Sequence, residues 1–253
     1  MLRPGLVSIT YRALSPREIV NACVDAKLEG IEWGGDVHVM PDDLNNARAV
    51  GTMTRDVGLE VAAYGSYYRC DGAPFEPIIE TALALGAPLI RVWAGVTDAS
   101  DADESDWSRV SDELARISAI ARAAEVQVAT EFHGGTLTAR GQSARRLMEN
   151  TNSRTLWQPL RRGDDFDLCV EENLDELRAV VPWLSNVHVY EWADDANGKR
   201  QRLSLEGSKQ WPRYVEELRA IGGSRWLLLE FVPDDNPAIL SREAAALRAW
   251  IGE

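Results

Sequence analysis

One pattern repeats along the whole sequence: a short run rich in Val, Ile, Leu and aromatic residues, followed by a segment with helical signals. Eight such units are present, and their apolar runs are GLVSITY, EGIEWGG, LEVAAYGS, LIRVWAG, VQVATEFHGG, RTLWQPL, NVHVYEW and WLLLEFV. Nearly continuous apolar runs are typical of strands that are covered on both faces. The alternation of strand and helix therefore predicts a parallel sheet.

The helical segments between these runs have recognisable ends. Ser15-Pro16-Arg17-Glu18 has the pattern of a capping box with proline at the first helical position, and Gly30 follows the end of that helix. Further helices are expected over Pro41–Val57, Phe75–Leu85, Ser105–Ala124 and Trp211–Ile221.

Eight strand–helix units in 253 residues predict a closed α/β barrel of the (β/α)8 TIM type, with residues 1–253 forming one domain. No Gly-rich dinucleotide or phosphate-loop pattern follows any of the runs, which argues against an open, doubly wound sheet. No linker or shift in composition divides the chain.

Charge and cysteine content limit the partners and the location. The net charge of −13 would repel nucleic acid, and the chain has no polybasic patch for a membrane surface, so we expect a small-molecule substrate. No signal peptide or membrane span is visible, and the three cysteines suggest reduced thiols, so we expect a cytoplasmic protein. A homo-oligomer is compatible with the sequence, which does not determine it.

The last four apolar runs each contain one polar residue near their end: Glu131, Gln158, His188 and Glu230. In a barrel of this kind, chemistry occurs where strands end and the following loops begin. Each residue alone could be a hydrogen-bonded polar group of the barrel interior, although a carboxylate in a run such as LLLEF is costly to bury unpaired. The four together favour one shared divalent ion. The donor set suits Mn²⁺ first, with Mg²⁺, Co²⁺ or Zn²⁺ as alternatives.

Aromatic residues and histidines also lie near the predicted strand ends. Most buried tryptophan belongs to the core, but several at one rim can instead form walls that stack on a sugar ring, and both interpretations stay open. The candidates for substrate contact at this rim are Trp33, Trp93, Trp157, Trp192, Tyr64, His38 and His133.

The segments GIEWGGDVHV, TEFHGGTLT, NVHVYEW and LLLEF resemble the xylose-isomerase-like TIM barrel superfamily, among the sugar phosphate isomerase/epimerase proteins. The resemblance spans roughly all eight units. It implies a metal held by Glu, Asp, His and Glu after the last four strands, which fall here on Glu131, Gln158, His188 and Glu230. It also implies that Glu131 and Glu230 act as the catalytic acid/base pair.

The sequence departs from that family after the sixth strand. The family's Asp-x-x-His is Gln158-Pro159-Leu160-Arg161 in this chain. A neutral amide replaces a carboxylate, which implies weaker metal binding. Arg161 stands where a histidine often contacts the substrate, which implies a different substrate.

The resemblance implies a metal-dependent isomerase or epimerase of a keto-sugar, working through proton abstraction next to a carbonyl and a metal-stabilised enediolate. The same intermediate can expel a β leaving group, so a lyase or dehydratase acting on an oxidised sugar or keto-glycoside is the alternative. Three histidines and a net charge of −13 argue against a multi-metal DNA endonuclease on this fold. Gln158 keeps a non-catalytic sugar-binding barrel open.

Overall fold

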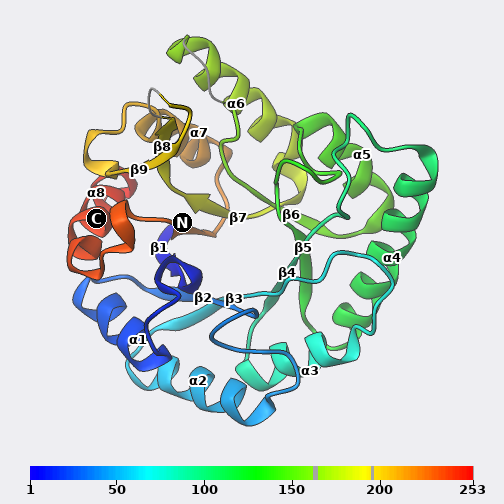
Figure 1. Ribbon diagram of the computed structural model, residues 1–253, viewed down its shortest axis with the longest axis horizontal. Coiled ribbons are helices and arrows are strands. Elements are labelled where there is room, and N and C mark those ends of the chain that lie inside the picture. Colours follow the sequence, from blue (N-terminus) through cyan, green and yellow to red (C-terminus); the bar gives the residue numbers. More distant parts are fainter. Residues whose placement is uncertain (162–164, 195–196, 253) are drawn as a thin grey trace.

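The computed structural model describes residues 1–161, 165–194 and 197–252, and in them eight parallel strands close into a barrel surrounded by helices (Figure 1). The barrel strands are β1 (Leu2–Val7), β2 (Gly30–Gly34), β3 (Glu60–Gly65), β4 (Leu89–Val92), β5 (Gln127–Thr130), β6 (Arg154–Trp157), β7 (Leu184–Val189) and β10 (Arg225–Leu229). Each strand pairs with its predecessor and its successor in the barrel, and β10 closes on β1. The predicted (β/α)8 barrel is confirmed.

Helices follow the strands and cover the outside of the barrel (Figure 1). The capping box at Ser15 is confirmed, since both of its hydrogen bonds are present. The second helix begins three residues later than Pro41 because Asp43 caps it by accepting from the Asn46 N–H. The helices are α1 (Pro16–Asp25), α2 (Leu44–Asp56), α3 (Glu76–Leu85), α4 (Glu104–Ala123), α5 (Gly141–Thr151), α6 (Phe166–Val180), α7 (Trp211–Ile221) and α8 (Leu240–Ile251). Among the described residues, none of these helices is long and apolar enough to cross a membrane.

The predicted strands run beyond the observed ones at several positions of the barrel, including the first, the fifth and the seventh. The first ends at Val7, and Ser8–Tyr11 forms a short 3-10 helix in which Ser8 Oγ accepts from the Gly34 N–H at 2.8 Å. A side-chain hydrogen bond of this kind competes with the strand ladder. The seventh predicted run, NVHVYEW, is divided between β7 and a second strand, β8 (Glu191–Asp194).

The strands β8 and β9 (Arg200–Leu203) form an antiparallel hairpin that lies outside the barrel sheet. Trp192 pairs with Arg202 in its register. Asn197-Gly198 precedes β9, and Gly198 has φ +73, a backbone conformation that glycine adopts at little cost. The hairpin is inserted between β7 and α7, at the mouth of the barrel (Figure 1).

Successive side chains of a strand face opposite sides of the sheet, and this decides which residues enter the barrel. Glu32 of β2 contacts His188 of β7, a strand that is not its neighbour, so both side chains face the barrel interior. The next residue along β2, Trp33, faces outward, where its Nε1 donates to Thr54 Oγ1 of α2. The main hydrophobic core lies on this outer side, between the sheet and the helices.

Candidate functional site

A chain of alternating acidic and basic side chains crosses the barrel interior. Arg91 of β4 donates through Nε to Glu32 Oε1 at 2.6 Å and through Nη1 to Glu131. Glu32 Oε2 lies 3.3 Å from His188 Nε2, and His188 Nδ1 lies 3.4 Å from Glu230 Oε2. Glu131 and Glu230, the two predicted catalytic carboxylates, are therefore the two ends of one buried network.

The charges in this network stabilise one another against burial. Burial by itself raises the pKa of Glu32, but Arg91 and His188 outweigh it and hold the pKa at about 2. Burial lowers the pKa of His188, yet Glu230 and Glu32 raise it to about 10. Burial likewise opposes the charge of Arg91, whose pKa is nevertheless raised by Glu131 and Glu32. The interior of the barrel is thus built for charged side chains.

The main chain fixes the two terminal carboxylates where the barrel strands end. The Glu131 N–H donates to Val92 O at 2.8 Å and the Glu230 N–H donates to Val189 O at 2.9 Å, so each residue continues the sheet by one step. Phe231, directly after Glu230, has φ +59, which is uncommon for a bulky residue. Such strain is concentrated at functional sites, where the surrounding structure maintains it.

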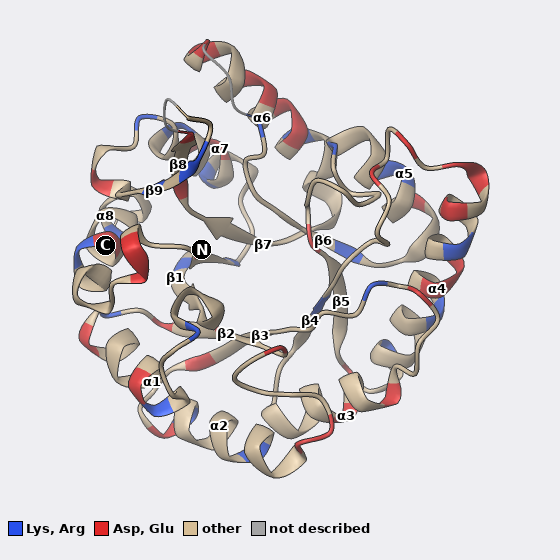
Figure 2. Cartoon of the chain, viewed as in Figure 1, with Lys and Arg blue, Asp and Glu red and all other residues tan. Residues whose placement is uncertain are grey.

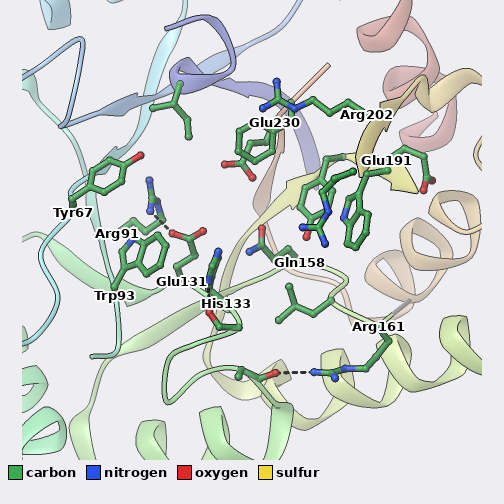
Figure 3. A pocket seen from close by; sticks show the side chains of 18 of the residues that line it. Tyr67, Arg91, Trp93, Glu131, His133, Gln158, Arg161, Glu191, Arg202 and Glu230 are labelled. Carbon is green, nitrogen blue, oxygen red and sulfur yellow. Dashed lines mark hydrogen bonds and ion pairs between the residues drawn. The ribbon is translucent and has the colours of Figure 1, made fainter. Parts of the chain in front are cut away.

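Both carboxylates open into one cavity of about 710 Å³ at the mouth of the barrel. This volume lies within the range of small-molecule sites. Figure 3 shows Glu131, Gln158 and Glu230 pointing into the same space. The other described residues that line it are Ile9, Arg12, Tyr67, Arg91, Trp93, Asp98, His133, Gly134, Ala139, Arg140, Leu160, Arg161, Tyr190, Glu191, Trp192, Arg200, Arg202 and Phe231.

Two buried polar side-chain atoms near these carboxylates make no hydrogen bond. Gln158 donates through Nε2 to Phe132 O at 2.8 Å, and its Oε1 is buried without a hydrogen bond. His188 Nδ1 is also buried without a hydrogen bond. The lone pairs of Gln158 Oε1, left unsatisfied beside a carboxylate, are chemically suited to a cation. A metal would bind His188 Nδ1 by displacing its proton, while Nε2–H donates a hydrogen bond to Glu32, an arrangement common at metal sites.

Glu131 is less available than the other three predicted ligands. One of its oxygens is engaged by Arg91, and in the part of the chain that the structure describes, no three Asp, Glu, His or Cys side chains are grouped closely enough to hold a metal. The donors that fit an ion here include the Gln158 amide oxygen, which is outside that group of residue types. We therefore expect Gln158, His188 and Glu230 to be the main ligands of a metal. Glu131 could bind it only while one of its oxygens stays paired with Arg91.

Four of the residues predicted to contact substrate line this cavity: Trp93, His133, Arg161 and Trp192. The rings of Trp93 and His133 are in contact, with centroids 4.4 Å apart. Arg161 donates through Nη2 to Ala139 O at 2.8 Å, which orients its guanidinium along the wall.

The other four predicted contacts do not line the cavity, and strand alternation and local hydrogen bonds explain why. Trp33 faces α2, and Trp157 packs in the core against Tyr214 of α7, with ring centroids 5.4 Å apart. The Tyr64 hydroxyl donates to Val39 O, and His38 Nδ1 shares a hydrogen bond with Ser8 Oγ at 2.9 Å. For Trp33 and Trp157, the core interpretation is the one that the structure adopts.

Several residues of the buried network and of the cavity were not predicted from the sequence. Arg91 and Glu32 were visible near strand ends, but nothing in the sequence indicates that they bond to each other across the barrel. Arg200 and Arg202 come from the hairpin, for which the turn dipeptide Asn197-Gly198 was an available signal.

The comparisons with known proteins agree with this architecture. A model of the family described as xylose isomerase-like TIM barrel matches residues 20–250. No curated protein sequence matches the chain. Among solved structures, the probable 3-DHS dehydratase AsbF of Bacillus anthracis aligns with a TM-score of 0.78 and 19% identity, over 98% of each chain.

Two further solved structures are similar over nearly the whole chain. A D-psicose 3-epimerase in the presence of D-fructose has a TM-score of 0.73 and 14% identity, over 99% of this chain and 100% of that one. A xylose isomerase-like TIM barrel protein of Mycobacterium smegmatis in complex with magnesium has a TM-score of 0.69 and 12% identity, over 99% and 98%. At these identities, the likeness shows a shared fold.

Proposed function

The chain belongs to the xylose isomerase-like TIM barrel family, and from that premise we propose that it is a metal-dependent isomerase or epimerase of a small keto-sugar or related carbohydrate. The observation that carries the proposal is the cavity in which Glu131 and Glu230 meet the unsatisfied Gln158 Oε1. Two carboxylates and an unsatisfied amide oxygen in one sugar-sized space are suited to proton transfer beside a polarised carbonyl.

We propose Gln158, His188, Glu230 and Glu131 as the metal ligands, with Mn²⁺ first and Mg²⁺, Co²⁺ or Zn²⁺ as alternatives. A bound divalent ion would polarise the substrate carbonyl and acidify the neighbouring C–H. Glu32 would orient His188 by accepting from Nε2, 3.3 Å away. Arg91 would hold one oxygen of Glu131 and leave the other for the substrate.

In this proposal, Glu131 and Glu230 exchange the substrate proton. One carboxylate removes the proton next to the carbonyl, and an enediolate results. Return of a proton by the other carboxylate from the opposite face inverts the carbon, which is epimerisation. Return by the same carboxylate to the adjacent carbon gives isomerisation. Trp93 and Trp192 on the cavity wall supply apolar surface for the C–H faces of the sugar.

The second candidate is a lyase or dehydratase that uses the same carboxylates. His133 on the cavity wall favours it, because an imidazole can protonate a leaving hydroxyl group. The shared fold with a probable 3-DHS dehydratase agrees with this alternative without deciding it. The cytoplasmic location and any homo-oligomer remain predictions from the sequence.

Solvent exchange tests the proposal directly. Keto-sugars are incubated with the protein and Mn²⁺ in heavy water, and deuterium uptake next to the carbonyl is followed by NMR. We expect uptake by the unmodified protein, and its loss in Glu131→Gln and in Glu230→Gln, by about 10²–10⁴-fold in turnover. Glu216→Gln, the same change at an exposed site on α7, is the control.

The outcomes separate the candidates. Uptake with a new sugar supports the isomerase or epimerase, whereas uptake with loss of water supports the dehydratase. Undiminished uptake in both cavity variants assigns proton transfer to another residue. Sugar binding with no exchange in the presence of any of the four metals supports the non-catalytic barrel.

A further inference from the structure

The cavity wall has the opposite charge to the rest of the molecule. Among the described lining residues outside the buried network, five arginines face two carboxylates: Arg12, Arg140, Arg161, Arg200 and Arg202 against Asp98 and Glu191. The whole chain has 27 basic and 40 acidic residues. Figure 2 shows acidic segments spread over the outer helices and basic segments on the β8–β9 hairpin beside the mouth.

The two wall carboxylates are engaged by other groups. Asp98 accepts from the Gly135 N–H at 2.8 Å and from Ser100. Glu191 accepts from Ser208 Oγ and from Gln210 Nε2, each at 2.6 Å. These contacts direct the hydrogen-bonding capacity of both carboxylates at groups other than the wall arginines.

The hairpin presents two of these arginines side by side. Arg200 and Arg202 are two positions apart in β9 and therefore lie on the same face of the strand. Arg200 stacks over the Trp192 ring at 3.4 Å, and Arg202 stacks over the Phe231 ring at 4.4 Å. Stacking fixes a guanidinium by its face and leaves its N–H edge for a planar anion.

Nearby carboxylates compensate the positive charges of Arg200 and Arg202 only in part. Arg202 pairs through Nη1 with Asp235, and the Arg200 Nε lies 3.8 Å from Asp194 Oδ1, beyond hydrogen-bond distance. On another part of the wall, burial and the charge of Arg140 lower the pKa of Arg161. Like charges held together in this way favour a counter-anion.

We propose that Arg200 and Arg202 bind a carboxylate of the substrate, so that the reacting molecule is a sugar acid or a related keto acid. Arginine recognises carboxylates through paired N–H donors in a plane. A phosphate fits less well, because the loop after β10 carries Asp234 and Asp235, and their charges oppose a dianion. This substrate class rests on the proposed function, whereas anion binding itself is measurable without turnover.

Three ligands with one carbon skeleton test the proposal by isothermal titration: D-fructose, D-fructuronate and D-fructose 6-phosphate. We expect D-fructuronate to bind at least about 10-fold more tightly than D-fructose. Arg200→Gln and Arg202→Gln should each reduce that advantage, measured as the ratio of the two dissociation constants in the same variant, by about 10-fold. Arg145→Gln, which removes the same charge from an exposed position on α5, should leave that ratio unchanged.

A second variant separates charge from geometry and from misfolding. Arg202→Lys keeps the charge but lacks the planar pair of donors, so it should retain an intermediate advantage and melt like the unmodified protein. Equal binding of the three ligands by the unmodified protein overturns the proposal. So does an advantage of D-fructuronate that survives when Arg200→Gln and Arg202→Gln are combined. Tighter binding of D-fructose 6-phosphate overturns the carboxylate assignment. Failure of the heavy-water experiment with intact D-fructuronate binding would reject only the proposed reaction.

Discussion

Removing Arg91 is the sharpest test of the buried network. The Arg91 side chain is only 2% exposed, and its two carboxylate partners, Glu32 and Glu131, are 0% and 7% exposed. Arg91→Met would leave both carboxylates in the barrel interior without their cation. Breaking a buried ion pair by removing one partner typically costs about 3–5 kcal/mol, because the uncompensated charge stays behind.

This loss is large beside the roughly 5–15 kcal/mol of a typical domain. We expect Arg91→Met to lower the free energy of unfolding by about 3–5 kcal/mol in urea titrations followed by tryptophan fluorescence. Arg145→Met is the control, because Arg145 and Glu149 form an ion pair on α5 in which the two side chains are 53% and 46% exposed. Exposed pairs of this kind contribute about 0–1 kcal/mol.

A double variant decides whether the cost arises from the orphaned charge. Glu32→Gln in the Arg91→Met background removes one uncompensated carboxylate. The loss of stability in the double variant should therefore be smaller than the sum of the losses in the two single variants, by about 1–3 kcal/mol. Strictly additive losses, or a loss below about 1 kcal/mol in Arg91→Met, would refute the reasoning. Neither result depends on knowing the substrate.

Three further predictions concern acid stability and the metal. The pKa of Glu32 in the folded chain is held at about 2, below its ordinary 4.5. Its contribution of about 3 kcal/mol to the free energy of unfolding is therefore present above pH 4.5 and is lost as the pH falls towards 2. Glu32→Gln should flatten this part of a plot of stability against pH. Gln158→Asp should bind Mn²⁺ more tightly by titration calorimetry, since it adds a negative charge, and unchanged affinity would place the ion elsewhere. Chelation of the metal should stop heavy-water exchange and Mn²⁺ should restore it, whereas Glu230→Gln should bind Mn²⁺ weakly and recover no exchange at any concentration.

The local sequence was sufficient for much of the fold. Strand and helix periods, the capping box at Ser15 and glycines after helices are properties of neighbouring residues, so they are visible without a structure. The hairpin after β7 was missed because the apolar run NVHVYEW continues through Tyr190 without a break. Its turn signal, Asn197-Gly198, is local and could have been used.

The candidate site divides in the same way. By itself, the sequence placed Glu131, Gln158, His188 and Glu230 at the ends of successive strands, and strand order in a barrel brings such ends to one mouth. Only the tertiary structure decided that Trp33 faces a helix while Glu32 faces the interior, and that Arg91 joins Glu32 to Glu131. The reason is physical: a strand's local pattern fixes its period of two, but which face turns inward, and which side chain meets it from across the barrel, depends on closure of the whole sheet.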